Sequence, residues 1–109
     1  MAVFALVHGA GDVGWSWHLV RAELEARGHR AVAPDLPCDD DTATLADYAD
    51  AVLDALLDAA GPLDGQRDLV VVGHSYGGLT AALVAARAPV AALVLLAAMV
   101  PAPGERPAD

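Results

Sequence analysis

A serine flanked by glycines joins a strand-like segment to a helix-like segment in the second half of the chain. The Gly-His-Ser-Tyr-Gly-Gly motif at 73–78 follows the apolar run 68–72 and precedes the helix-like segment 77–87. A G-x-S-x-G motif in this setting predicts a sharp turn that holds the Oγ of Ser75 above a sheet. Small residues on both sides of the serine let the two backbones approach closely. The motif therefore requires a strand and a helix that pack together.

Short apolar runs alternate with helix-like segments along the rest of the chain. The expected strands and helices are, in order, strand 2–7, helix 16–27, strand 30–33, helix 42–60, strand 68–72, helix 77–87 and strand 91–97. Apolar spacings of three and four residues identify the helices. Strands that alternate with helices pair in parallel through right-handed crossovers. The sequence predicts an α/β fold with an open, mainly parallel sheet of about four strands and three helices.

The charge balance restricts the classes of partner. The 109 residues include six arginines, no lysine and fifteen acids, for a net charge of −9. Nucleic acids and anionic membranes bind through cationic side chains, so neither is expected as a partner. The longest apolar stretch, 88–103, is too short to cross a bilayer. The single cysteine, Cys38, excludes an internal disulfide, and no signal peptide is visible, so the sequence favours a cytoplasmic protein.

An acidic stripe on the expected helix 42–60 raises the question of a metal site. Its members recur every three or four residues: Asp47, Asp50, Asp54 and Asp58. A solvated outer face is the simpler interpretation, since leucines and valines occupy the other side of the helix. No other cluster has metal-ligand spacing, and neither a metal nor another cofactor is expected.

A second glycine motif offers a competing function. Residues 9–14 form a G-x-G-x-x-G pattern, and Asp35 follows about 20 residues later, as in dinucleotide-binding folds. Trp15 and Trp17 come directly after the third glycine, where a helix should pack closely on a strand. A dinucleotide site would also leave the serine motif unexplained. Dinucleotide binding therefore stays as the weaker alternative.

Five ordered segments resemble the α/β-hydrolase superfamily, namely 8–10, 14–17, 34–37, 73–78 and 95–105. The nearest branch is the esterase group related to plant methylesterases and hydroxynitrile lyases. The resemblance covers nearly the whole chain and implies a serine hydrolase that acts on small-molecule carboxylic esters without a cofactor. Two loops, 11–13 and 38–40, depart from the pattern of the family, and both are expected to border the substrate pocket.

The resemblance also implies roles for individual residues. Ser75 would be the nucleophile, and the backbone N–H groups of Ala10 and Tyr76 would form the oxyanion hole. The residues expected to line the substrate pocket are Gly9, Gly11 and Trp17. Asp35 is expected to fix a loop. Among the histidines, His8 is expected to brace the oxyanion loop and His74 to pack structurally, while His18 and His29 are surface or structural.

The sequence lacks part of the catalytic triad. In α/β hydrolases the order along the chain is serine, acid, histidine. After Ser75 the only acids are Glu105 and Asp109, and no histidine follows. We therefore expect residues 1–109 to be the N-terminal part of a single α/β-hydrolase domain, truncated after the strand that follows the helix 77–87, and nearly inactive alone. A non-catalytic binding module with the same fold is the alternative.

Overall fold

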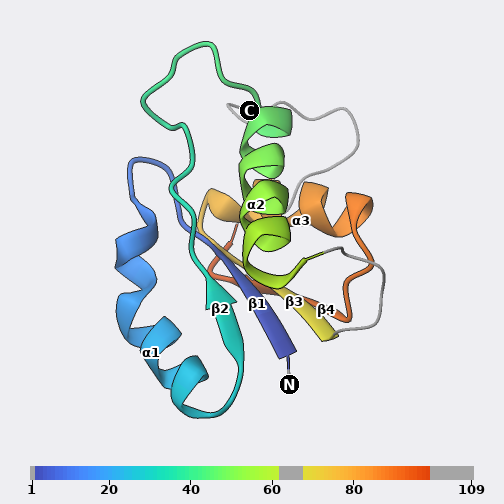
Figure 1. Ribbon diagram of the computed structural model, residues 1–109. Helices are drawn as coiled ribbons and strands as arrows, with labels where there is room; N and C mark the ends of the chain where they lie inside the picture. Colours follow the sequence, from blue (N-terminus) through green and yellow to red (C-terminus); the bar gives the residue numbers. More distant parts are fainter. Residues whose placement is uncertain (1, 62–67, 99–109) are drawn as a thin grey trace.

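The computed structural model describes residues 2–61 and 68–98 (Figure 1). The elements in chain order are β1 (Ala2–Val7), the 3-10 helix η1 (Gly14–Trp17), α1 (His18–Ala26), β2 (Arg30–Val32), α2 (Leu45–Ala60), β3 (Asp68–His74), α3 (Gly77–Arg87) and β4 (Ala92–Leu96). A helix follows each of β1, β2 and β3, which is the alternation that the sequence predicts.

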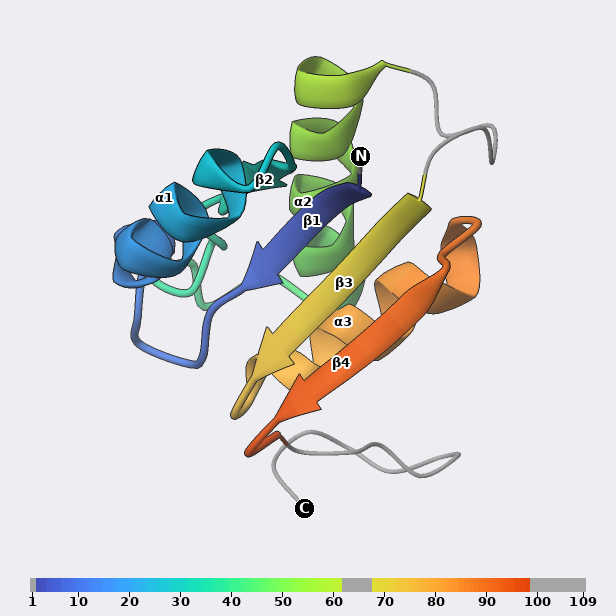
Figure 2. The same cartoon turned by 90° about the horizontal axis from the view of Figure 1, so that it is seen from below.

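The four strands form one sheet in the order β2-β1-β3-β4. All three strand pairs are parallel, and β1 pairs with β3 from Ala2↔Asp68 to Val7↔Gly73. The expected open parallel sheet with three α-helices is confirmed (Figure 2). Because β1 and β3 are neighbours, the loop after β1 and the turn after β3 leave the sheet side by side.

The two faces of the sheet carry separate apolar cores. The larger core lies under α2 and α3 and contains the buried side chains of Val3, Ala5, Val7, Val52, Leu56, Leu69, Val71 and Val84, among others. The smaller core lies on the opposite face, where Leu6, Trp17 and Ala31 pack together near α1. Alternate residues of β1 therefore belong to different cores, as expected for a strand covered on both faces.

Two helix starts differ from the sequence prediction. The segment expected as one helix from 16 to 27 begins instead with the 3-10 helix, and regular α-helix starts at His18. The helix expected from 42 starts at Leu45, because Thr44 caps it: the Thr44 hydroxyl accepts from the Asp47 N–H, and the Asp47 carboxylate accepts from the Thr44 N–H. This reciprocal pair satisfies two N–H groups that would otherwise lack partners.

The edge strand β4 is solvent-exposed along its whole length. Its side chains are apolar, and Leu96 is 52% exposed. The register pairs Val72 with Val94 and His74 with Leu96, which places these two β4 residues on the α1 face of the sheet. Helix α1 packs near β2, at the opposite edge, so it does not cover them (Figure 2). Part of the α1 face of the sheet is therefore left uncovered by the helices of the described residues.

Residues 2–61 and 68–98 show neither a membrane-spanning helix nor a cluster of metal ligands. None of their helices combines the length and apolar character needed to cross a membrane. In the same ranges, no three His, Cys, Asp or Glu side chains come together in a way that could hold a metal ion. The aspartates of α2 are spread along its outer surface, where Asp50 pairs with Arg87 at 3.1 Å.

Candidate active site

Ser75 occupies the turn between β3 and α3 in a left-handed backbone conformation, with φ of 56°. Non-glycine residues adopt this conformation only at a cost, and it is the conformation of a sharp strand-to-helix turn. Gly73 shows why small residues flank the serine, since a Cβ there would lie 2.7 Å from the Cβ of Ala81 in α3. Strand and helix are therefore as close as the sequence motif requires.

The loop after β1 lies against Ser75. A Cβ placed on Gly9 would be 3.4 Å from the Cβ of Ser75 and 3.9 Å from its Oγ. Ala10 follows Gly9 in this loop and is exposed, and Tyr76 follows Ser75 as the N-cap of α3. Within the described parts of the chain, the N–H groups of Ala10 and Tyr76 donate in none of the loop and turn hydrogen bonds. The structure thus brings Gly9, Ala10, Ser75 and Tyr76 together.

His8 is buried beneath this loop, with 1% of its surface exposed. Its Nδ1 lies 2.8 Å from the Gly9 carbonyl oxygen, and its Nε2 accepts the backbone N–H of Leu36 at 2.9 Å. The expectation that His8 braces the loop by hydrogen bonding is confirmed. Both ring nitrogens are engaged, so His8 has no nitrogen left to act as a base for Ser75.

The second glycine motif is explained by packing in this same region. Gly14 lies so close to the Ala33 carbonyl that any side chain there would overlap it. The Gly14 N–H donates to Oδ1 of Asp35 at 2.7 Å, so this carboxylate fixes the loop, as expected. Gly14, the third glycine of the motif, and Asp35, the candidate ribose-binding acid, therefore both have structural roles. They connect the loop after β1 with the loop after β2.

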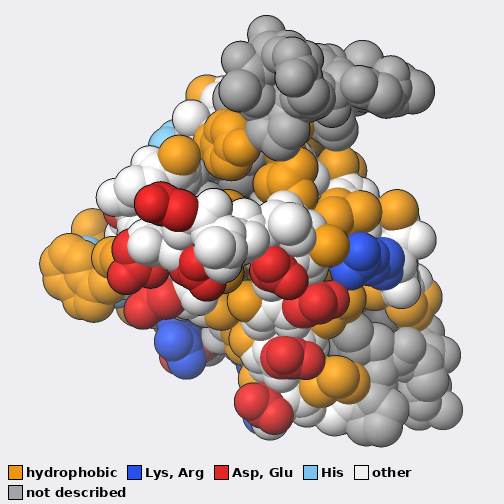
Figure 3. All heavy atoms as spheres, turned by 90° about the horizontal axis from the view of Figure 1, so that it is seen from above, with side chains coloured by type: hydrophobic (Ala, Val, Ile, Leu, Met, Phe, Trp, Pro, Cys, Tyr) orange, Lys and Arg blue, Asp and Glu red, His pale blue; other side chains and the backbone are white. Residues whose placement is uncertain are grey.

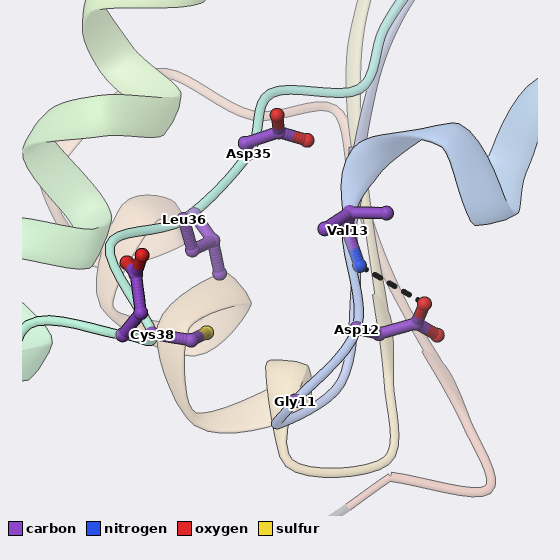
Figure 4. Close-up of a pocket in the computed structure, with 7 residues that line it drawn as sticks. Gly11, Asp12, Val13, Asp35, Leu36 and Cys38 are labelled. Atoms are coloured by element: carbon purple, nitrogen blue, oxygen red, sulfur yellow. Dashed lines mark hydrogen bonds between the residues drawn. The ribbon is translucent and has the colours of Figure 1, made fainter.

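Two cavities involve the loop between β2 and α2, and Tyr76, which follows Ser75, lines one of them. The first has a volume of about 340 Å³ and is lined by Gly11, Asp12, Val13, Asp35, Leu36, Cys38 and Asp39. Figure 4 shows Leu36 and Cys38 of the β2–α2 loop facing Gly11 of the loop after β1. The second cavity, of about 320 Å³, is lined by Ala43, Thr44, Leu45, Tyr48 and Tyr76. Ser75 itself lines neither of them.

Acidic residues dominate the polar part of the first cavity. Three of its lining residues are aspartates, and viewed from above Figure 1, acidic side chains form a band across the surface (Figure 3). Asp12 and Asp35 accept backbone N–H groups from Val13 and Gly14. The sequence marked the loop 38–40 as unusual, but the pairing of this loop with residues 11–13 depends on the folded sheet.

Tyr48, which lines the second cavity together with Tyr76, interacts with Cys38. Tyr48 of α2 is half-buried, and its pKa is raised above the ordinary value, mainly by burial and then by a hydrogen bond with the side chain of Cys38. Nearby, hydrogen bonds from the Thr42 side chain and backbone lower the pKa of Asp40. Sequence analysis missed Tyr48 as a residue of this region, because it lies on a helix that only the fold brings to the loop.

Trp17 and Gly11 line different cavities, and Asp12 lines both. It is 7% exposed, packs with Leu6 and Ala31 on the α1 face, and lines a different cavity of about 220 Å³ together with His74 and Leu96. The structure does not place it in the cavity lined by Gly11. His74 is exposed rather than packed, which corrects our expectation. Its ring lies nearly perpendicular to that of Trp17, with the ring centroids 6.3 Å apart.

A base for Ser75 is not found among the described residues. His18 is exposed and stacks on Trp15, and His29 accepts the N–H of Ala2. Within residues 2–61 and 68–98, no histidine forms a hydrogen bond with the Ser75 side chain. Glu105 and Asp109, the two acids that follow Ser75 in the sequence, and the end of the similar segment 95–105 lie outside the described residues. The site therefore has a candidate nucleophile and candidate oxyanion donors without a base.

Comparisons with known proteins agree on one family. The family model described as "Alpha/beta hydrolase family" matches residues 4–109. Esterase PIR7B of Oryza sativa subsp. japonica is 44% identical over 111 residues, which cover 94% of this chain and 40% of that protein. The chain thus spans about two fifths of the length of the curated relatives it matches.

Solved structures give the same result. Polyneuridine aldehyde esterase superposes with a TM-score of 0.78 and 30% identity, over 96% of this chain and 43% of that one. A pyrethroid hydrolase from Sphingobium faniae JZ-2 superposes with a TM-score of 0.77 and 33% identity, over 95% and 42% of the two chains. In both cases the similarity covers nearly all of this chain and leaves more than half of the larger protein unmatched.

Proposed function

Because the chain belongs to the alpha/beta hydrolase family, we propose that it carries the nucleophile and the oxyanion hole of a serine hydrolase for small carboxylic esters. The observation that carries this proposal is the left-handed Ser75 at the β3–α3 turn, directly beside Gly9. The matched relatives named as esterases support the choice of ester as substrate class. No cofactor takes part in this chemistry.

The proposed reaction proceeds through an acyl-enzyme. The Oγ of Ser75 attacks the ester carbonyl, and the carbonyl oxygen becomes an oxyanion that accepts hydrogen bonds from the N–H groups of Ala10 and Tyr76. The alcohol leaves with the serine proton, and water then releases the carboxylic acid. Loss of one such donor costs roughly 10²–10³ in kcat, so these two N–H groups supply a large part of the rate.

The base and the acid of the triad are proposed to come from polypeptide beyond Asp109. No histidine follows Ser75 in the sequence, and His8 uses both ring nitrogens elsewhere. The relatives continue well beyond the matched region, and β4 exposes apolar side chains to solvent. These facts support a chain that forms the N-terminal part of one hydrolase domain. Without the base, only about 10³–10⁴-fold catalysis over water should remain.

Hydrolysis of a p-nitrophenyl ester by the 109-residue chain and by its Ser75→Ala variant tests the missing base. We expect both proteins to hydrolyse the ester slowly and at similar rates. Fast turnover that disappears in Ser75→Ala would show that the 109-residue chain is active alone. It would contradict the proposal that the base lies outside these residues.

A chimaera tests the nucleophile. This chain, through its last residue matched to esterase PIR7B, is joined to the part of PIR7B that lies beyond the matched region. We expect fluorophosphonate labelling and ester turnover in the chimaera, and neither in its Ser75→Ala form. A folded Ser75→Ala chimaera that hydrolyses the ester as well as the unmodified chimaera would overturn the role of Ser75. The alternative, a non-catalytic binding module, would be favoured by two results together: the 109-residue chain is stable alone, and the folded chimaera hydrolyses no ester.

A further inference from the structure

We infer that His8 is a positioning residue that sets the direction of the Ala10 N–H. The inference rests on the proposed role of Ala10 as an oxyanion donor, but its structural part can be tested without any activity. It starts from the fact that His8 is buried, lies at the end of β1, and forms hydrogen bonds through both ring nitrogens.

The two hydrogen bonds fix the tautomer of the His8 ring. The backbone N–H of Leu36 is always a donor, so Nε2 of His8 must carry the lone pair that accepts it at 2.9 Å. The neutral ring then carries its proton on Nδ1, which donates to the Gly9 carbonyl oxygen at 2.8 Å. Neither nitrogen can exchange its role without leaving two donors or two acceptors face to face.

The Gly9 carbonyl is held by two donors. Besides His8 Nδ1, the backbone N–H of Asp12 donates to the same oxygen at 3.2 Å. Within the described residues all peptide bonds are trans. In a planar trans peptide the C=O and the N–H point in opposite directions, and the carbonyl of Gly9 shares its peptide plane with the N–H of Ala10. The bond from His8 therefore fixes which way the Ala10 N–H points.

The other side of the ring connects this peptide to the border of the first cavity. Leu36, which donates to Nε2, lines that cavity together with Gly11 and Cys38. A single buried ring thus joins the loop after β1 to the loop after β2. The two sides of His8 have separate functions: Nδ1 orients the candidate oxyanion donor, and Nε2 holds the β2–α2 loop in place.

Two amide substitutions separate these functions. The His8→Asn side chain reaches the position of Nδ1 and can donate to Gly9, but it is too short to accept from Leu36. The His8→Gln side chain reaches the position of Nε2 and can accept from Leu36, but it leaves the Gly9 carbonyl without its side-chain donor. The exposed His18, changed to Asn, provides a matched histidine control.

The experiment measures the backbone of the 109-residue chain by NMR. The residual dipolar coupling of the Ala10 N–H reports its direction, and hydrogen exchange of the Leu36 N–H reports the second bond. We expect His8→Gln to change the Ala10 coupling and keep Leu36 protected. We expect His8→Asn to keep the coupling and speed Leu36 exchange roughly tenfold. His18→Asn should change neither.

An unchanged Ala10 coupling in a folded His8→Gln variant would overturn the positioning role. If neither variant folds, the wild-type chain still decides, because ring ¹⁵N shifts of His8 must show a proton on Nδ1 and none on Nε2, and the opposite tautomer would overturn the inference. Fluorophosphonate labelling of the chimaera distinguishes the orientation of the Ala10 N–H from its proposed role as an oxyanion donor. A changed coupling in His8→Gln with undiminished Ser75 labelling would confirm that His8 orients the Ala10 N–H and would overturn the proposed role of Ala10 as an oxyanion donor.

Discussion

The backbone N–H of Gly14 donates to Oδ1 of Asp35 across 2.7 Å, which joins the loop after β1 to the loop after β2. His8 and Leu36 join the same two loops deeper in the protein. The cavity lined by Gly11 and Cys38 lies between these loops, so its border is held by one part-buried and one buried hydrogen bond. The first prediction follows from the part-buried bond.

Asp35→Ala should destabilise the chain by about 1 kcal/mol, because the Gly14 N–H loses its acceptor. Asp35→Asn keeps an oxygen in place and should recover most of this loss. Urea unfolding followed by circular dichroism measures both. Asp39→Ala is the control, since it removes the same charge from the same loop and lines the same cavity. Equal losses in Asp35→Ala and Asp39→Ala would mean that charge, and not the bond to Gly14, is responsible.

Ser75→Gly should be more stable than Ser75→Ala by a few tenths to about 1 kcal/mol. The left-handed backbone at this position, with φ of 56°, costs energy for any residue that carries a Cβ. Glycine removes that cost but gains freedom in the unfolded chain, which offsets part of the benefit. Urea unfolding of the two variants side by side gives the difference. The strain argument fails if the glycine variant unfolds at lower urea concentration.

Cys38→Ala should lower the pKa of Tyr48 part of the way toward its ordinary value. Burial is the main cause that raises this pKa and remains in the variant, whereas the hydrogen bond and the charge of Cys38 are removed. Titration of the Tyr48 ring carbon by NMR measures the change, with Tyr76 in the same spectra for comparison. A pKa that does not move would show that Cys38 does not contribute to the shift of Tyr48.

The same shift has a consequence for stability at high pH. A group whose pKa is raised by folding holds its proton more tightly in the folded state. Its contribution is fully present below the unfolded pKa, about 10 for tyrosine, and is lost as the pH rises through the folded value. The stability of Cys38→Ala should therefore fall less steeply with rising pH in this alkaline range than that of the wild-type chain.

Thr44→Ala should cost about 1 kcal/mol, because the hydroxyl of Thr44 caps the first turn of α2. Thr44→Ser keeps the hydroxyl and should lose much less. Hydrogen exchange of the Asp47 N–H, which donates to Thr44 at 3.2 Å, locates the effect at the cap. Faster exchange spread evenly over all helices would instead indicate a general loss of stability.

Val94→Lys should reduce self-association of the chain at high concentration. Val94 is 44% exposed on the edge strand β4, and a lysine on such an edge opposes pairing with another strand. Sedimentation velocity over a range of concentrations measures the effect. Leu19→Lys, at a position 73% exposed on α1, adds the same charge away from the sheet edge. If both lysines act equally, the cause is net charge and not the strand edge.

The order of strands and helices could be predicted because it depends on local patterns. The turn at Ser75 was predictable for the same reason, since glycines and apolar runs lie within a few residues of it. The elements that differ depend on contacts between distant segments. Helix α1 begins at His18 and not at residue 16, because residues 14–17 form a 3-10 helix. Gly14, at its start, is held against Ala33 and Asp35.

The same distinction between local patterns and distant contacts applies to the candidate site. Ser75, Tyr76 and the loop at Gly9 could be identified from motifs, and the structure brings them together. The neighbourhood of Cys38 and Tyr48 could not, because the loop and the helix that carry them meet only after the β2–α2 loop folds back. The place of Trp17 on the α1 face depends on which side of β1 the 3-10 helix takes, and no local pattern encodes that choice.

The pairing of Val7 with Gly73 has a consequence for how the chain is made. The loop with Gly9 leaves the ribosome long before Ser75, and until β3 emerges, β1 can pair only with the three-residue strand β2. Contacts between segments so far apart in sequence form slowly, because a long loop must close first. The two halves of the candidate oxyanion hole therefore meet only after most of the sheet has been synthesised, and the growing chain carries an unpaired β1 edge until then.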